Sequence, residues 1–409
     1  MPAQTSTRSR PTGTERRGQI LAATAELMGR RGFEGTTVDD IGQAVGITAA
    51  GLYRHFRNKQ ALVEAVILGM LSELVATVGD ATGPEQTVGD VQAVFVGFVL
   101  DRPYQVATYL REQTRLDGDA ARTQAQLEDA FFAAQGLALA RATGLDCEGI
   151  HDPIMRLRIA ASFGAARAHV SANVQMKRPT LDRFIADALA TVALAPLQVH
   201  TADPAQSTPA GWSVDSPRRR ILENALPLFR EQGFGGVTVA EVGEAAGIAG
   251  PNIYRYFDSK VDILVDVFDR VGERVMAGLD EAIQGAGDVD EALGAVVRSY
   301  VDVAYDNVDL IVVMDQERTS LPESERPRLR RRAALLAEAW RSIVAQCRPD
   351  LSTVEVDTLV RAATSLVNTC CRQRPVATPQ NVAILTEAFL RGTFHPVSKP
   401  GVADAHRST

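Results

Sequence analysis

The chain has little cysteine, no signal-peptide core and no long apolar run. Its four cysteines form no C-x-x-C pair and are too few to staple 409 residues, so a reducing compartment is expected. The apolar stretch Val91–Leu100 is far shorter than the ~20 residues that cross a membrane. Residues 1–13 are rich in Ser, Thr, Pro and Arg and predict a disordered arm. We therefore expect a cytoplasmic protein without a membrane anchor.

The motifs of common catalytic sites are also absent. The sequence contains no G-x-S-x-G, G-x-x-x-x-G-K, H-E-x-x-H or G-x-G-x-x-G pattern, and its six histidines show no metal-ligand spacing. The cysteines are interpreted as small buried hydrophobes. They are Cys147, Cys347, Cys370 and Cys371. The chain is therefore predicted to be no enzyme and to hold neither a metal ion nor a cofactor.

Positive charge is local rather than general. The formal net charge is −7, yet residues 1–60 hold nine Lys/Arg against five Asp/Glu, whereas residues 211–260 hold six of each. The length of 409 residues exceeds the ~250–300 residues that one core usually holds. We therefore expect at least two domains, the first of which is basic near its start.

What the sequence does contain is a repeated segment. Residues 17–59 align without a gap with residues 218–260, and seventeen of the 43 paired positions are identical. A period of about 200 residues is too long for a solenoid and indicates a duplicated domain. The chain is therefore predicted to consist of two similar halves.

Each copy begins with the signals of two helices. In the first copy an apolar stripe covers Ile20–Met28, and Gly32 follows it where a left-handed residue ends a helix. Thr37 and Asp40 have the spacing of a capping box and open a second, short helix. The second copy repeats the box in Thr238-x-x-Glu241.

A tight turn and a third helix follow. Gly46 permits the positive φ of a turn, and the Thr48 hydroxyl can cap a helix running through Leu52–Phe56. Asn58 can cap a fourth, longer helix, as can Ser259 in the second copy. Two helices joined by such a turn form a helix-turn-helix, in which the third helix of the domain is the recognition candidate.

At these residues a family resemblance becomes specific. Gly-Ile-Thr-x-x-x-Leu-Tyr-Arg-His-Phe-x-x-Lys, preceded by Thr-x-x-Asp-Ile-x-x-Ala-x-Gly, resembles the DNA-binding domain of the TetR family of bacterial repressors. The second copy, with Ala-Gly-x-Ala-Gly-Pro-x-x-Tyr-Arg, is similar to tandem TetR-type regulators of high-GC bacteria, including the repressor of a mammalian-cell-entry lipid-transport operon. The resemblance implies an all-α fold of two units packed as a pseudo-dimer. Each unit would have a three-helix DNA-binding domain and a helical ligand-binding domain.

The resemblance also implies which residues contact phosphates. In this family these are the helix-two threonine, two residues of the recognition helix and the lysine that opens helix four. The matching positions are Thr37, Tyr53, His55 and Lys59 in the first copy, and Thr238, Tyr254, Tyr256 and Lys260 in the second. Hydroxyl, imidazole and ammonium groups all donate hydrogen bonds to phosphate oxygens, which agrees with these roles.

Base-reading residues are expected on the recognition helix itself. The candidates are Thr48, Ala49, Ala50 and Arg54 in the first copy, and Ala249, Gly250, Pro251, Asn252 and Arg255 in the second. Arginine suits guanine and asparagine suits adenine in the major groove. Because the two sets share only the arginine, we expect an asymmetric operator. Phe56 and Phe257 are interpreted as core, and DNA contact by the arginines of the first seventeen residues is left open.

The second copy departs from the pattern in three ways. Ala249 replaces the capping Thr48, Pro227 lies inside helix one at a cost of ~3 kcal/mol, and the local charge is zero. These departures fit either a domain that has lost DNA binding or one adapted to a different half-site. The second interpretation is favoured because Asn252, Tyr254 and the other contact types remain.

The rest of each half is predicted to be helical. Apolar runs in the first half predict five or six helices, and Ala160-Ala161-Ser162 lines up with Ala362-Ala363-Thr364 in the second. By resemblance the last two helices of each half pair within the chain, across a flexible linker that spans about 25 Å. The predicted segments are an arm 1–13, DNA-binding domain 14–60, ligand-binding domain 61–195, linker 196–217, DNA-binding domain 218–261, ligand-binding domain 262–395 and a disordered tail 396–409.

The predicted function is a ligand-responsive repressor that binds a double-stranded DNA operator as a single-chain pseudo-dimer, or as a dimer of chains. Its effector would be small and apolar or amphipathic. Candidate ligand contacts, most of which are interpreted as core, are Tyr104, Tyr109, Arg111, Phe131 and Phe132, and Tyr300, Tyr305, Met314 and Arg318. The alternative is a ligand-binding or protein-interaction module with vestigial helix-turn-helices, which would bind no specific DNA.

Overall fold

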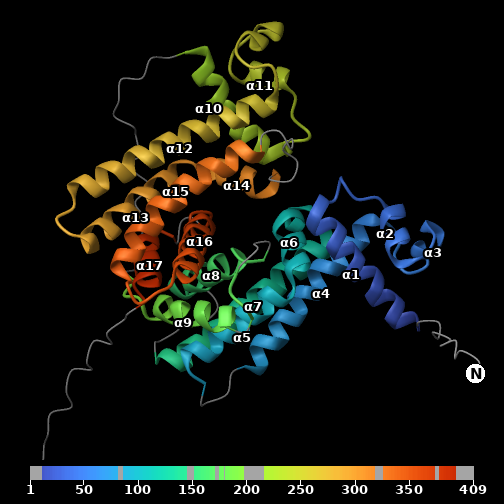
Figure 1. Ribbon diagram of the computed structural model, residues 1–409. Helices are drawn as coiled ribbons and strands as arrows, with labels where there is room; N and C mark the ends of the chain where they lie inside the picture. The colour runs from blue at the N-terminus through green and yellow to red at the C-terminus, as the bar shows by residue number, and fades with distance from the viewer. Residues whose placement is uncertain are drawn as a thin grey trace, which may run out of the picture.

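The computed structural model is all-helical over the residues it describes, which confirms the predicted fold class (Figure 1). Those residues are 12–81, 86–144, 152–170, 175–178, 180–197, 216–317, 326–373 and 377–392. Most of the predicted arm and linker, all of the predicted tail, Cys147 and Arg318 lie outside the described residues.

Both halves have the same order of helices. The first contains α1 (Gly13–Arg31), α2 (Val38–Val45), α3 (Ala49–Tyr53), α4 (Lys59–Asp80), α5 (Val88–Asp101), α6 (Pro103–Glu112), the 3₁₀ turn η1 (Gln113–Arg115), α7 (Gly118–Thr143), α8 (Pro153–Arg167) and α9 (Thr180–Leu194). The second contains α10 (Pro217–Gln232), α11 (Val239–Ala245), η2 (Gly250–Arg255), α12 (Lys260–Gly285), α13 (Val289–Asp306), α14 (Val308–Glu317), α15 (Arg326–Cys347), α16 (Thr353–Cys370) and α17 (Pro379–Arg391). Apart from η1, each element of the first half has a counterpart in the second.

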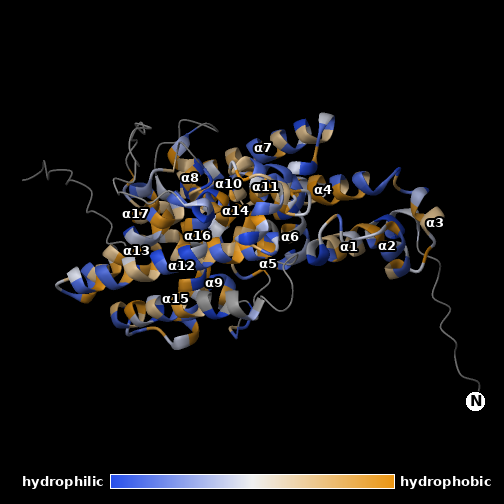
Figure 2. Cartoon of the chain, turned by 90° about the horizontal axis from the view of Figure 1, so that it is seen from above, coloured by the Kyte–Doolittle hydropathy of each residue, from blue (hydrophilic) through white to orange (hydrophobic). Residues whose placement is uncertain are grey.

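One apolar core extends through both halves. It joins residues of α4 to α9 to residues of α13, α15, α16 and α17. The helices carry apolar and polar stretches in alternation, as expected for helices that bury one face (Figure 2). The second helix-turn-helix has a separate small core, in which Ile221, Phe229 and Phe257 pack with Leu310 of α14.

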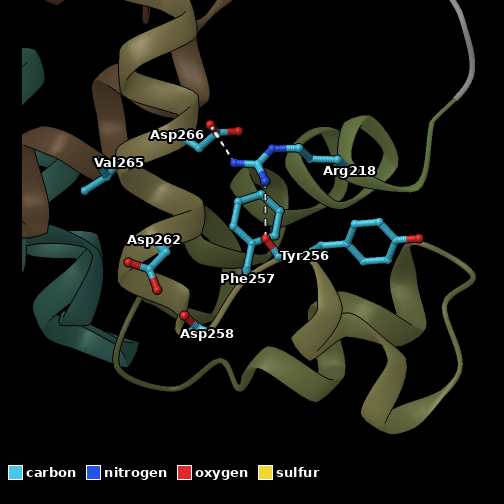
Figure 3. Close-up of a pocket in the computed structure, with 7 residues that line it drawn as sticks. All are labelled: Arg218, Tyr256, Phe257, Asp258, Asp262, Val265 and Asp266. Carbon is cyan, nitrogen blue, oxygen red and sulfur yellow. Dashed lines mark hydrogen bonds and ion pairs between the residues drawn. The ribbon is translucent and has the colours of Figure 1, made fainter.

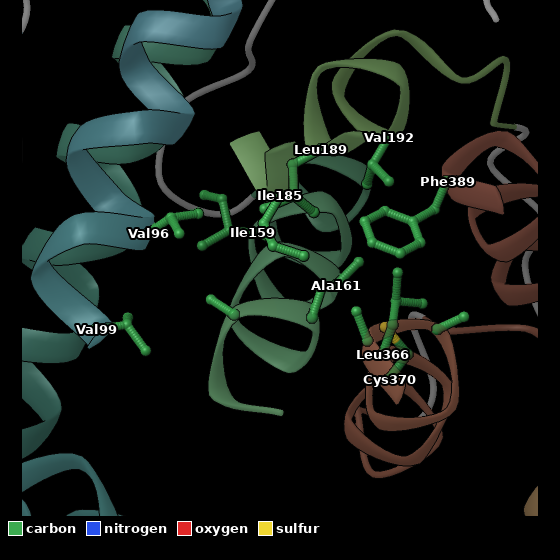
Figure 4. Packing of buried hydrophobic residues seen from close by; sticks show 14 of the residues in the cluster. Val96, Val99, Ile159, Ala161, Ile185, Leu189, Val192, Leu366, Cys370 and Phe389 are labelled. Carbon is green, nitrogen blue, oxygen red and sulfur yellow. The ribbon is translucent and has the colours of Figure 1, made fainter. Parts of the chain in front are cut away.

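The two halves meet through the last two helices of each. Phe389 of α17 is fully buried and lies beside Val192 of α9, with Leu366 of α16 close by (Figure 4). The Thr191 hydroxyl donates to the carbonyl of Ala388 at 2.8 Å across this boundary. The contact therefore has the four-helix composition that the family resemblance implied for the pairing of halves.

Helix α4 shows a property that the sequence analysis did not anticipate. By length and composition it is apolar enough to cross a membrane. Its side chains Leu62, Ile67 and Leu74 are buried in the core, and a buried core helix passes the same test. The hydropathy of α4 is thus explained by packing.

Candidate nucleic-acid interface

Helix two opens with the same capping box in both copies, as predicted. The Thr37 hydroxyl oxygen accepts from the Asp40 amide at 3.1 Å, and the Asp40 carboxylate accepts from the Thr37 amide at 2.8 Å and hydroxyl at 2.7 Å. Thr238 and Glu241 make the same three bonds. Donation by the Thr37 hydroxyl and amide lowers the pKa of the Asp40 carboxyl below its ordinary value. Both threonines are exposed, but a phosphate would have to compete with the carboxylate for the hydroxyl proton.

In the first copy, α3 places an exposed face over a buried one. Gly46 adopts the predicted left-handed turn at φ 70°, and the Thr48 hydroxyl oxygen caps α3 by accepting from the Gly51 amide at 3.2 Å. Leu52 and Phe56 are buried as predicted. The outward side chains are those of Thr48, Ala50, Tyr53 and Arg54, while Ala49 and His55 are half-buried. The helix ends at Tyr53, earlier than predicted, so Arg54 and His55 lie in the turn that follows it.

The recognition element of the second copy, η2, is a 3₁₀ helix rather than the α-helix that the repeat predicted. Ala249 offers no side-chain cap, and Pro251 stands in the first turn. Without a capping hydroxyl, tighter bonds such as Asn252 amide to Ala249 carbonyl at 3.1 Å satisfy the backbone. The inner and outer faces are nonetheless conserved between the copies, because Ile253 is buried and Tyr254 is exposed. The outward side chains are those of Pro251, Asn252, Tyr254 and Arg255, and Tyr256 is half-buried.

An arginine at the start of each copy holds the recognition element in place. The guanidinium of Arg17 donates to the His55 carbonyl at 3.2 Å and lies 4.2 Å from the ring centroid of Phe56. Arg218 makes the same two contacts at the equivalent positions, at 3.3 Å and 4.4 Å. This pair was not among the predicted site residues, although the identity of the two arginines at the first aligned position is a usable signal.

A second arginine secures the end of helix two in each copy. Arg16 donates to the carbonyl of Val45 at 2.9 Å, and Arg220 donates to the equivalent carbonyl of Ala246 at 3.2 Å. Arg16 and Arg17, which the sequence left open between solvent and DNA, are therefore directed at the backbone of their own domain. The two copies reach the same contact from different sequence positions.

The lysines that open α4 and α12 differ in their surroundings. The Lys59 ammonium lies 4.1 Å from the ring centroid of Phe33, and partial burial lowers its pKa. The Lys260 ammonium lies 4.8 Å from the equivalent ring of Phe234 and also donates to three carbonyls, those of Phe234 at 2.5 Å, Gly235 at 3.1 Å and Val237 at 3.0 Å. An ammonium has three protons, so the turn between α10 and α11 uses all of them.

The second copy also has an acidic hollow beside its recognition element (Figure 3). Its volume is about 250 Å³, and its lining consists of Arg218, Tyr256, Phe257, Asp258, Asp262, Val265 and Asp266. Arg218 donates to Asp266 at 3.0 Å, and the other two carboxylates stand on the opposite side (Figure 3). The aligned residues of the first copy are Arg57, Ala61 and Ala65 where the second has the three aspartates. This hollow is polar and unlike a site for an apolar effector.

Two of the predicted ligand contacts lie between α6 and α1 instead. The Tyr104 oxygen accepts from Arg30 at 2.5 Å, and the Tyr104 carbonyl lies so close to Gly29 that a Cβ there would be 2.9 Å away. Arg111 donates to the carbonyls of Gly29 and Arg30 at 3.5 Å. Glu112 accepts from the Phe33 amide at 2.8 Å. Helix α6 thus grips the end of α1 and couples the first DNA-binding domain to the remainder.

The other predicted ligand contacts are parts of the core. Tyr109 donates to Glu128 at 2.9 Å, and burial raises the pKa of its hydroxyl far above the ordinary value. Phe131 stacks on Phe95 with centroids 5.7 Å apart. The remaining contacts are Arg156 over Phe132, Tyr300 with Asn368 and Trp340, Tyr305 with the Ala377 carbonyl, and Met314 against the second small core. The structure does not bring these side chains together around one cavity that the described residues define.

Comparison with known families identifies both copies. The model described as "Bacterial regulatory proteins, tetR family" matches residues 20–66 and again residues 221–267. A model described as a tetracyclin repressor-like C-terminal domain matches residues 286–372. Each helix-turn-helix, including the one with a 3₁₀ recognition element, is therefore recognised on its own.

Curated relatives match over about 60 to 110 residues of the chain. The HTH-type transcriptional repressor KstR2 of Rhodococcus jostii is 41% identical over 59 residues, 14% of this chain and 29% of that protein. KstR2 of Mycolicibacterium smegmatis is 35% identical over 106 residues, 25% and 51% of the two chains. The HTH-type transcriptional activator FasR of M. smegmatis is 23% identical over 110 residues, 27% and 50% of the two chains. The chain spans about a third to a half of the length of these relatives.

Solved structures of regulators resemble about half of the chain. A TetR-family regulator from Bordetella parapertussis has a TM-score of 0.39 and 20% identity, covering 43% of this chain and 93% of that one. KstR2 of Mycobacterium tuberculosis has a TM-score of 0.37 and 20% identity, covering 44% and 93%. The assignment rests on the sequence matches, since these scores are low. It confirms the prediction that the chain is not an enzyme, because the matched family consists of regulatory proteins. The chain belongs to the TetR family of bacterial regulatory proteins and carries the N-terminal helix-turn-helix domain of that family twice.

Proposed function

We propose that this chain is a transcriptional repressor that binds operator DNA with both of its helix-turn-helices and is released by a small effector. The observation that carries the proposal is the same in both copies. Tyr53 and Tyr254 are 50% and 54% exposed, each directly after a fully buried residue of the recognition element and directly before an exposed arginine. Each tyrosine presents a hydroxyl that can donate to a phosphate oxygen, and both stand where the family contacts DNA.

The proposed contacts divide into phosphate and base contacts. Phosphates would be bound by the exposed tyrosines, by Lys59 and His55, and by the N-terminus of helix two behind Thr37 and Thr238. Bases would be read from the outward residues of α3 and η2, led by Arg54 in one copy and by Asn252 and Arg255 in the other. The two outward sets differ, which supports an asymmetric operator.

The first copy would supply most of the electrostatic affinity. Within the described residues, the Lys59 ammonium lies over the Phe33 ring without carbonyl contacts like the three that bind Lys260. Arg57 stands where the second copy has Asp258. Asp258 and Asp262 beside η2 repel phosphates, while Asp266 is paired with Arg218, so the second copy would contribute mainly by reading bases and setting register. We assign Lys260 a positioning role, in place of the phosphate contact implied by the resemblance.

One chain would form the binding unit. A homodimeric regulator uses two helix-turn-helices about one DNA turn apart, ~34–36 Å, one from each subunit. Within this chain α8 and α9 pair with α16 and α17, so one chain joins two helix-turn-helix units as a dimer of subunits would. Tethering would keep the halves together at an effective concentration in the mM range.

An effector would act through α6, whose Arg111 and Glu112 hold the end of α1. We propose a small apolar or amphipathic effector in the cytoplasm, in line with relatives named KstR2 and the Bacillus subtilis fatty acid metabolism regulator protein. Control of a lipid-transport operon is the corresponding proposal for the target. Repression is favoured over activation because the relatives with 35–41% identity carry the name of a repressor.

An electrophoretic mobility shift with DNA from upstream of the coding sequence tests the proposal. The full chain should shift this fragment in the presence of excess unrelated DNA. Tyr53→Ala should weaken the shift, whereas Arg122→Ala, an exposed arginine of α7 outside both helix-turn-helices, should leave it unchanged. A chain that binds no fragment at any salt concentration would establish the alternative, a ligand-binding or protein-interaction module with vestigial helix-turn-helices.

A further inference from the structure

The crossing of α8 and α16 depends on one glycine. A Cβ added to Gly164 would lie 2.8 Å from the Cα of Leu366 and 2.9 Å from the Cβ of Thr369. Real Cβ atoms essentially never come that close to a backbone carbon. Glycine inside a helix costs about 1 kcal/mol relative to alanine, so its presence here needs a packing reason. The close approach of the two helices is that reason.

The residues that meet at this crossing are counterparts in the two halves. Alignment of Ala160-Ala161-Ser162 with Ala362-Ala363-Thr364 pairs Gly164 with Leu366 and Arg167 with Thr369. Gly164 indeed packs on Leu366, and the Nε of Arg167 donates to the Thr369 hydroxyl at 2.9 Å. In a twofold interface, a residue contacts its own counterpart only at the axis. These two pairs therefore mark the pseudo-twofold axis between the halves.

At the axis the two halves differ in size and charge. In one pair, Gly164 of the first half packs on the bulky Leu366 of the second. In the other pair, the cationic Arg167 of the first half donates to the neutral hydroxyl of Thr369. Two first halves would bring glycine against glycine, which leaves a void, and arginine against arginine, which repels. Two second halves would bring leucine against leucine at a separation set for glycine. Either like pairing is worse than the unlike one.

We propose that these two axis pairs are a pairing lock that makes each half select a half of the other type and reject a half of its own type. The partner that fits this surface is the complementary half, supplied by the same chain. The lock goes beyond the proposed function because it concerns which halves associate, whether or not they bind DNA. It also explains how two similar surfaces on one chain avoid joining chains head to head.

The first test compares two Gly→Ala variants, which should change the melting temperature in opposite directions. Gly69 lies exposed in the middle of α4 with open space around it, so Gly69→Ala should raise the melting temperature of the full chain by roughly 1 °C, the ordinary helix effect. Gly164→Ala should lower it, because the added methyl must push the α16 backbone away. An equal rise for both variants would overturn the close-packing argument.

The second test builds like pairings into the intact chain. The double variant Leu366→Gly with Thr369→Arg places the axis residues of the first half in both halves. The double variant Gly164→Leu with Arg167→Thr places the axis residues of the second half in both halves. Each double variant should melt roughly 2–4 °C below the wild type. The fourfold variant combines all four substitutions and so restores unlike pairs with the two halves exchanged. It should regain at least half of the lost melting temperature, and light scattering should find one chain per particle. The lock would be refuted by double variants as stable as the wild type. It would also be refuted by a fourfold variant whose melting temperature falls by the sum of the decreases of the two double variants. Neither readout involves DNA, so a failure of the lock is distinct from a failure of the proposed function.

Discussion

The two equivalent lysines should respond in opposite ways to the same substitution. Lys59 and Lys260 occupy the first position of α4 and α12, and both match the phosphate-contacting lysine of the family. Both ammonium groups lie over an aromatic ring, and that of Lys260 is in addition bound by the carbonyls of Phe234, Gly235 and Val237. We predict that Lys59→Ala changes DNA binding and that Lys260→Ala changes the stability of the second DNA-binding domain.

The magnitudes follow from the two kinds of contact. Removing one phosphate contact lowers the slope of log affinity against log salt by about 0.9, so the affinity lost between 50 and 200 mM salt shrinks about 3.5-fold for Lys59→Ala. Removing Lys260 breaks three hydrogen bonds, each contributing about 1 kcal/mol net, although the exposed carbonyls regain water. A loss of roughly 2–3 kcal/mol from the small separate core of that domain is expected.

The assay combines binding and unfolding on the same proteins. Fluorescence anisotropy with an operator duplex at several salt concentrations gives the slope, and urea unfolding gives the free energy of unfolding. Lys177→Ala, an exposed lysine before α9, serves as the control and should alter neither quantity. Binding is measured at a temperature where all variants remain folded, so that lost structure is not read as lost contact.

One outcome would refute the reasoning. If Lys260→Ala lowered the salt slope as much as Lys59→Ala and left the free energy of unfolding unchanged, then the carbonyl contacts of Lys260 would be incidental. Both copies would then grip DNA alike, and the second copy would be an ordinary phosphate-binding domain.

Four further predictions concern specificity, pH and the binding unit. Arg54→Ala should lower discrimination at one base pair by ~1–3 kcal/mol and leave non-specific binding largely intact, and a selection from random sequences checks this. Because the pKa of the Asp40 carboxyl is lowered in the folded state, the cap stabilises the fold at pH values above the ordinary Asp pKa, and this stability is lost as the pH falls through the folded pKa. Thr37→Ala should remove this part of the pH dependence of the free energy of unfolding. An unchanged pH profile would speak against the cap. Binding-site selection with the full chain should return an asymmetric operator, and a perfect inverted repeat with equal tolerance in both arms contradicts the difference between α3 and η2. Native mass spectrometry should find one chain per operator, with the complex lost after cleavage within residues 196–217, whereas a smallest specific complex with two chains would exclude the single-chain unit.

The local features of both DNA-binding domains could be predicted from sequence. Capping boxes, the left-handed turn at Gly46 and the alternation of Leu52 and Phe56 with Tyr53 are signals within one or two helical turns, and the structure confirms them. Gly32 ends α1 with the predicted positive φ of 75°, but its ψ of 174° is extended and not that of a left-handed helical stop. The fold class followed from the same signals because the repeat states them twice. The length of α3 and the 3₁₀ form of η2 were missed, since a missing cap or a proline shifts a short helix by amounts that periodicity does not resolve.

Only the tertiary structure decided which long side chains contact the protein itself and which stay exposed. Lys59 and Lys260 open equivalent helices and lie over equivalent phenylalanine rings, yet the Lys260 ammonium also donates to carbonyls of a turn 23 to 26 residues away. Tyr104 and Arg111 look like pocket residues by size, but the approach of α6 to α1 occupies them. Gly164 carries no local signal at all. Its role depends on a helix about 200 residues distant, because contacts between elements are set by how helices pack and not by the spacing of residues along one of them.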